Sequence, residues 1–286
     1  MSRSSPGVRR VAAILDFIAD HPGQAFALTD LVRALKLSRA TCHALLTGLV
    51  DVGYLYRTGD KTYVLGPALA AIGRTAAEHF SPLQVAQPEM RRLADEFDVV
   101  CAAYFLEGDV IHLRDRAASL SHVGYPVPLG ARMKLRSAQA AAFFAWSPAE
   151  TEAWLETTDP KLGAERRELM FRSMEFARAH GFVVLLRRPG FDMADNRYDP
   201  HAGADSDDIP VVPVSEIDSA GIYSVGALMA PIFDARGKVN FCLLMAGFHV
   251  NMTGVALMAT GQRLRAACQR ISNFVAGRDG GARTAL

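Results

Sequence analysis

Apolar residues recur every three or four positions over 8–20, 28–35 and 38–52, the spacing of helices that each bury one face. His21-Pro22-Gly23 ends the first helix, because proline cannot continue one. Lys36-Leu37-Ser38 is a short turn, and Ser38 is a plausible N-cap for the third helix. The positions expected to be buried in the first and third helices are Val8, Val11, Leu15 and Ile18, and Cys42, Leu45, Leu46, Leu49 and Val52.

Two β-rich runs follow, at 54–57 and 62–65, on either side of the turn Thr58-Gly59-Asp60-Lys61. Three helices and a hairpin predict a winged helix-turn-helix, a unit that sets its third helix into the major groove and its wing on phosphates. A three-helix module that binds protein is the alternative. The candidate DNA-binding residues are Ser38, Arg39, Ala40, Thr41, His43 and Thr47 on the helix, and Arg57 and Lys61 on the wing.

The rest of the chain mixes helical and strand patterns. A helix with an apolar stripe covers 67–80, and further helices are expected at 82–97, at 138–146, after the N-cap Ser147 with Pro148 at the first helical position, at 165–180 and at 253–275. Strands are expected at 99–106, 110–114, 132–135, 182–186, 226–233 and 239–248. Because strands and helices do not alternate strictly, the class is α+β. The predicted domains are 1–66, a connecting helix 67–80, and 81–286.

Charge is distributed unevenly although the net charge is only +1. Residues 1–74 hold nine basic and five acidic residues, a net +4, whereas the other 212 hold 22 and 25, a net −3. A basic N-terminal part favours a polyanion partner there. With 50% hydrophobic and 21% charged residues, a largely disordered chain is excluded.

Four widely spaced cysteines without a C-x-x-C predict buried, reduced thiols, and only Cys42 has basic neighbours that could suit a redox sensor. No apolar run is long enough for a membrane span and no signal core follows the basic start, so we expect a cytoplasmic protein.

Residues 10–66 resemble the N-terminal domain of IclR-family transcriptional regulators. The resemblance rests on Arg39-Ala40-Thr41-Cys42-His43, the exit Gly53-Tyr54-Leu55 and the wing end Tyr63-Val64-Leu65-Gly66. One departure is Ala44, where the family usually carries an arginine. The resemblance extends more loosely over residues 8–277. It implies double-stranded operator DNA as a partner, a homodimer or tetramer joined through helix 67–80, and a C-terminal GAF-like α/β domain that binds a small organic effector, such as an aromatic or short-chain acid.

The segment 130–137 resembles the pocket loop of that family, with departures. Lys134 and Arg136 replace the usual proline and histidine, and Ala141-Ala142-Phe143 replaces Gly-Lys-Ala. The two cations could pair with a carboxylate, although we favour a solvated basic edge. The apolar positions could equally be plain core. The candidate effector-binding residues are Gly130, Arg132, Met133, Lys134, Arg136, Ala141 and Phe143, with a far wall of Ala227, Met229, Cys242 and Leu244.

An acidic, proline-containing loop is expected at 187–220, with eight acids against three arginines. It could be a lid over the pocket, or Asp199, His201, Asp205 and Asp207 could hold a metal, although we favour a loop that binds nothing.

The sequence contains no nucleophile elbow, P-loop, dinucleotide fingerprint or zinc-protease motif. We therefore predict a regulator rather than an enzyme, with no cofactor and no metal. The alternative is a small-molecule-binding or enzymatic domain whose winged helix serves dimerisation.

Overall fold

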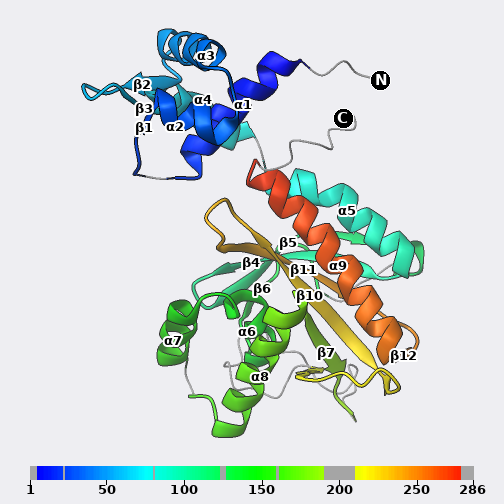
Figure 1. Ribbon diagram of the computed structural model, residues 1–286. Coiled ribbons are helices and arrows are strands. Elements are labelled where there is room, and N and C mark those ends of the chain that lie inside the picture. The colour runs from blue at the N-terminus through cyan, green and yellow to red at the C-terminus, as the bar shows by residue number, and fades with distance from the viewer. Residues whose placement is uncertain are drawn as a thin grey trace. The chain divides into compact units, whose positions relative to one another are not determined.

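The computed structural model describes residues 5–21, 23–79, 81–122, 127–158, 161–189 and 210–277. The chain divides into two compact units, Met1–Ser81 and Pro82–Leu286 (Figure 1). Within the described ranges, no helix has both the length and the apolar character needed to cross a membrane.

The N-terminal unit has the predicted three helices and hairpin. The helices are α1 (Pro6–Ala19), α2 (Leu28–Leu35) and α3 (Arg39–Asp51), and the hairpin strands are β2 (Leu55–Arg57) and β3 (Thr62–Leu65). A two-residue strand that the pattern did not predict, β1 (Phe26–Ala27), pairs with β3 and gives the sheet order β1-β3-β2. Helix α4 (Pro67–His79) follows within the same unit.

The small core of this unit differs from the predicted one at the ends of two helices. Val8 is 68% exposed and Val52 is 58% exposed, whereas Ile14, absent from the predicted stripe, is completely buried. Val8 lies in the first turn of α1, outside the core, and Val52 is the C-cap after the last turn of α3. The buried residues are Ile14, Ile18, Leu31, Cys42, Leu46, Leu49, Leu55 and Tyr63.

A close backbone approach joins the base of the wing to the start of α4. The Gly66 N–H donates to the Tyr54 carbonyl at 2.8 Å, and the Ala68 N–H donates to the Gly53 carbonyl at 3.2 Å. A Cβ atom at Gly66 would lie 2.2 Å from the Gly53 carbonyl oxygen, which no side chain can tolerate. Glycine at position 66 therefore allows the chain to leave the wing and begin α4 directly.

The C-terminal unit is built on a seven-stranded antiparallel sheet of order β6-β5-β4-β11-β10-β7-β8. Its strands are β4 (Val100–Glu107), β5 (Val110–Ala118), β6 (Arg132–Lys134), β7 (Val183–Arg187), β8 (Val211–Pro213), β10 (Val225–Phe233) and β11 (Val239–Ala246). A separate pair joins β9 (Ile222–Tyr223) and β12 (Met252–Thr253), and η1 (Leu120–His122) follows β5. This mixture of helix and antiparallel sheet confirms the α+β class.

Helices cover both faces of the sheet (Figure 1). One face packs against α5 (Pro82–Phe97) and α9 (Gly254–Val275), and the other against α6 (Ser137–Phe144) and α8 (Ala164–His180), while α7 (Pro148–Thr157) contacts α6. The elements agree with the predicted pattern except for η1 and the short strands β8, β9 and β12. Strand β8 lies inside the expected acidic loop, because Val211 and Val212 pair with β7 there and form the edge of the sheet.

Candidate functional site

The turn between α2 and α3 is built by local hydrogen bonds. Lys36 ends α2 in the left-handed conformation, with φ 51°, and the Leu37 N–H donates to the Val32 carbonyl at 3.3 Å. Ser38 is the N-cap of α3, as predicted: its Oγ accepts from the Thr41 N–H at 3.1 Å. The Ser38 hydroxyl also donates to Thr41 Oγ1 at 2.9 Å. The first turn of α3 is therefore fixed without using the side chain of Arg39.

Helix α3 presents opposite faces of different chemistry. Its buried face consists of Cys42, Leu46 and Leu49. The predicted DNA-binding residues lie on the other side: Ser38, Arg39, Ala40, His43 and Thr47 are exposed, and Thr41 is half-buried. Ala44, at the departure from the family pattern, is exposed between them. An exposed helix face with a cation near the positive N-terminal end of the helix dipole suits contact with a polyanion.

Cys42 lies on the buried face, and this contradicts its possible role as a redox sensor. Its side chain has no exposed surface, and burial raises the pKa of the thiol, which disfavours the reactive thiolate. The other three cysteines are also free and buried, and burial raises the pKa of Cys101 to about 12.

The wing is a tight, hydrogen-bonded hairpin. The Thr58 N–H donates to the Thr62 carbonyl at 2.8 Å, and the two threonine hydroxyls lie 2.6 Å apart. Lys61 adopts φ 62°, a left-handed conformation that costs a non-glycine residue about 1 kcal/mol. Arg57 lies with its guanidinium carbon 6.0 Å from the centre of the Tyr63 ring. Both side chains are exposed, as contact with DNA phosphates would require.

The predicted effector residues come together, but in a packed core. Ala141 and Phe143 on α6 join the sheet residues of the predicted far wall in a single buried cluster. The Cys242 thiol lies 3.2 Å from the Ala142 carbonyl, so β11 contacts α6 directly. The members of this cluster that we predicted are Met133, Ala141, Phe143, Ala227, Met229, Cys242 and Leu244, each 6% exposed or less.

The two candidate cations of the pocket loop differ in environment. Lys134 ends β6 with a side chain that is 43% exposed and 3.8 Å from a carboxylate oxygen of Asp109. Arg136 is only 1% exposed and is the N-cap of α6, so the solvated basic edge that we favoured is wrong for this residue. Gly130 and Arg132 are exposed. The alternative metal ligands Asp199, His201, Asp205 and Asp207 lie outside the described residues.

Comparison with known proteins agrees with this arrangement. Residues 7–59 match the model of the IclR helix-turn-helix domain. The transcriptional regulator KipR of Bacillus subtilis is 22% identical over 161 residues, which is 56% of this chain and 64% of KipR. The regulator TtgV of Pseudomonas putida is 27% identical over 124 residues, 43% of this chain and 47% of TtgV. The matched region is thus less than two thirds of either relative.

The fold is shared over nearly the whole chain. The crystal structure of the repressor BlcR of Agobacterium tumefaciens superposes with a TM-score of 0.62 at 16% identity, covering 96% of this chain and 99% of BlcR. The relatives that these comparisons identify are regulators rather than enzymes.

Proposed function

We propose that this chain is a one-component transcription factor of the IclR type, which the match of residues 7–59 to the IclR helix-turn-helix model and the fold shared with the repressor BlcR support. The observation that carries this proposal is the exposed polar face of α3, which starts at the Ser38 cap and lies opposite the buried Leu46. The N-terminal residues of this helix would read base edges in the major groove, while the wing neutralises phosphates. Such a protein would act in the cytoplasm.

A selection from random DNA tests the proposal. The purified full-length protein is mixed with a random pool of duplexes at about 0.15 M salt, because phosphate contacts make DNA affinity depend strongly on salt. An enriched, near-palindromic site is expected if two recognition helices bind together. The absence of enrichment, with only salt-sensitive background binding, would contradict sequence-specific recognition by α3.

Two-fold assembly would be supplied by α4. In the described chain, Ile72 is 49% exposed and Leu69 is half-buried, so the apolar stripe of α4 is incompletely covered within its own unit. A second copy of the chain is the partner that the family resemblance implies. Sedimentation of the full-length protein should give a dimer or tetramer, and Ile72→Asp should shift it toward the monomer. A wild-type monomer at micromolar concentration would contradict this part of the proposal.

The C-terminal unit would bind a small organic anion beside β6 and α6. Lys134 offers a half-exposed cation, and Arg136 offers a buried one at the start of a helix whose dipole also favours negative charge. Screening aromatic and short-chain carboxylic acids by thermal shift would identify an effector. Lys134→Ala and Arg136→Ala should then weaken its binding, whereas unchanged affinity in both variants would assign the two cations a structural role.

A further inference from the structure

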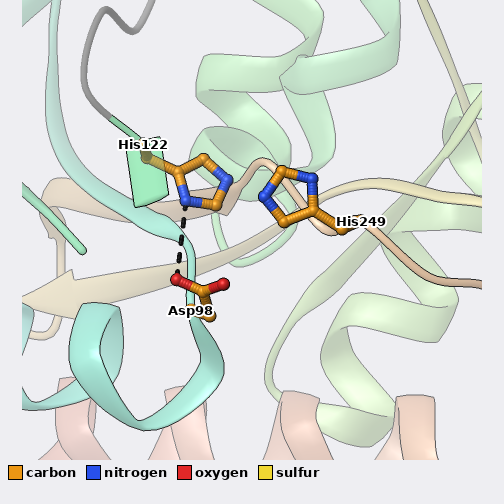
Figure 2. A group of neighbouring side chains, drawn as sticks. All are labelled: Asp98, His122 and His249. Atoms are coloured by element: carbon orange, nitrogen blue, oxygen red, sulfur yellow. Dashed lines mark ion pairs between the residues drawn. The ribbon is translucent and has the colours of Figure 1, made fainter. Parts of the chain in front are cut away.

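Three metal-ligating side chains from distant parts of the chain meet at one end of the large sheet (Figure 2). Asp98 lies between α5 and β4, His122 ends η1 after β5, and His249 follows β11. Strands β5, β4 and β11 are neighbours, so the segments at their shared end come together. One ligand atom of each residue lies within 4.8 Å of the other two.

His122 is held in the orientation that metal-binding histidines adopt. Its Nε2 lies 2.7 Å from the Gly247 carbonyl oxygen, which can only accept, so a neutral ring carries its hydrogen on Nε2. The lone pair of Nδ1 is thereby left on the side of Asp98, whose Oδ1 is 3.8 Å away. A backbone carbonyl that holds the second ring nitrogen fixes the tautomer and direction of a ligating imidazole. The His122 side chain is only 9% exposed.

The position of Gly247 makes this orientation possible. A Cβ atom there would lie 2.4 Å from Nε2 of His122 and 2.6 Å from its Cδ2. Gly247 also has φ 93°, a conformation that side chains rarely adopt. Because Gly247 has no side chain, the His122 imidazole can contact the backbone directly at this position.

Asp98 is prepared as an anionic ligand. Its Oδ1 accepts hydrogen bonds from Ser119 Oγ at 2.6 Å and from Ser121 Oγ. The two hydrogen bonds fix the direction of the Asp98 carboxylate, as partners of a metal-ligating carboxylate do. Both hydroxyl hydrogens are directed to the carboxylate, and the His122 Nδ1 lone pair stays available although the hydroxyl oxygens lie 3.0 and 3.1 Å from it.

His249 completes the group from the solvent side. Its ring centre is 4.5 Å from that of His122 with an interplanar angle of 30°, and the residue is exposed. Figure 2 shows the two rings side by side with Asp98 below them. An exposed side chain can adjust its rotamer, so His249 can move toward a shared ion while His122 and Asp98 stay in place.

We propose that Asp98, His122 and His249 bind one zinc ion, His122 through Nδ1, with water in the fourth position. Two imidazoles and one carboxylate are ligands that Zn²⁺ takes, at bond lengths of about 2.0–2.2 Å. Around a tetrahedral ion such bonds place ligand atoms about 3.3 Å apart. The observed 3.8 Å between Nδ1 and Oδ1 therefore requires only a small contraction. The ion would tie together the ends of three neighbouring strands.

The zinc site is independent of the proposed regulatory function, because none of its three ligands is among the residues proposed to contact DNA or effector. To test it, the tag-free full-length protein is treated with chelator, desalted and titrated calorimetrically with zinc chloride near pH 7.5. We expect one zinc per chain with a Kd in the micromolar range or below, and a higher Tm for the C-terminal unit. Cobalt should give the visible absorption of a tetrahedral N/O site.

Variants separate a metal site from a hydrogen-bonded cluster without an ion. His249→Ala alters an exposed residue, so the protein should fold, and zinc affinity should fall at least about tenfold. Gly247→Ala should lower the affinity for zinc, because the added methyl group would displace the His122 ring. The matched control is His201→Ala, in the acidic segment, which should leave the affinity unchanged.

Three results would overturn the proposal. They are the absence of saturable zinc binding by the wild type, wild-type affinity in His249→Ala, and loss of binding in His201→Ala. Loss of binding in His201→Ala would assign the zinc to the acidic segment that contains His201.

Discussion

The exposed face of α3 and the buried cluster between α6 and the large sheet carry the two sets of residues that the sequence singled out, and they differ in exposure. On α3, Arg39, His43 and Thr47 are exposed and contribute nothing to the core of their unit. In the buried cluster, Phe143 on α6 and Met229 on β10 are 3% and 0% exposed and belong to the core itself. A substitution on the first surface should therefore change binding alone, whereas one on the second should change stability first.

The largest effect is expected from Phe143→Ala. Truncating a buried phenylalanine should cost about 3–5 kcal/mol of unfolding free energy, because it removes buried apolar surface and leaves a cavity. Urea unfolding of the C-terminal unit, followed by circular dichroism, measures the loss. Arg39→Ala is the matched control and should change stability by no more than about 0.5 kcal/mol. Surface substitutions usually change stability by no more than about 0.5 kcal/mol. A loss in Phe143→Ala of similar size, below about 1 kcal/mol, would therefore show that Phe143 lines a cavity instead of packing in the core.

The second effect concerns DNA affinity. Once a DNA site has been selected, Arg39→Ala combined with Thr41→Ala should lower the affinity for that site roughly 100-fold, because each good base contact contributes about 1–3 kcal/mol of discrimination. Fluorescence anisotropy at constant salt measures the affinity, and Arg236→Ala in the C-terminal unit is the control for a lost surface cation. Unchanged affinity and sequence preference in the double variant would remove α3 from the interface.

The wing should contribute through charge alone. Replacing Arg57 and Lys61 by alanine should reduce the slope of log affinity against log salt by about two units, equivalent to roughly 30-fold in affinity at 0.15 M salt. Sequence preference should hardly change, since phosphates carry no sequence information. Titrations at several salt concentrations test this, and an unaltered slope would place the wing away from the DNA.

The smallest effect comes from charges that serve stability in the C-terminal unit. Glu89 on α5 accepts from Arg270 Nε on α9 at 2.7 Å and from Arg92 at 2.7 Å. These bonds, first that of Arg270, lower the pKa of Glu89. The stabilisation is therefore complete above the ordinary glutamate pKa and is lost as pH falls through the lowered value in the folded protein.

Glu89→Gln should accordingly reduce stability by about 1 kcal/mol near neutral pH, since the pair is partly exposed. The difference from the wild type should shrink as the solution is acidified below the ordinary carboxyl pKa of 4.5. Urea unfolding at several pH values measures it. Glu168→Gln is the control, because Glu168 is 73% exposed and lies 3.9 Å from Arg172. A difference that persisted in acid would show that the carboxylate charge is not its cause.

Most regular elements could be predicted from periodicity, because a helix or strand that buries one face leaves its period in the sequence. The exposed residues of α3 were predictable for the same reason: once Cys42, Leu46 and Leu49 face the core, Arg39 and His43 must face away from it. The two-residue strands β1, β9 and β12 were missed because segments this short carry no period, and β8 was missed because its pairing with β7 is a tertiary contact.

What the sequence determined by itself is therefore the order of the elements, the two-unit organisation and the family resemblance, which are properties of local pattern and of aligned motifs. The tertiary structure decided which apolar stripe is core and how far a charged group is buried. Periodicity did not place Arg136 inside, because burial depends on what packs over a residue from elsewhere in the chain.

The Asp98, His122 and His249 group shows the same limit most clearly. No spacing relates these three residues along the chain, and they meet only because β4, β5 and β11 are neighbours in the folded sheet.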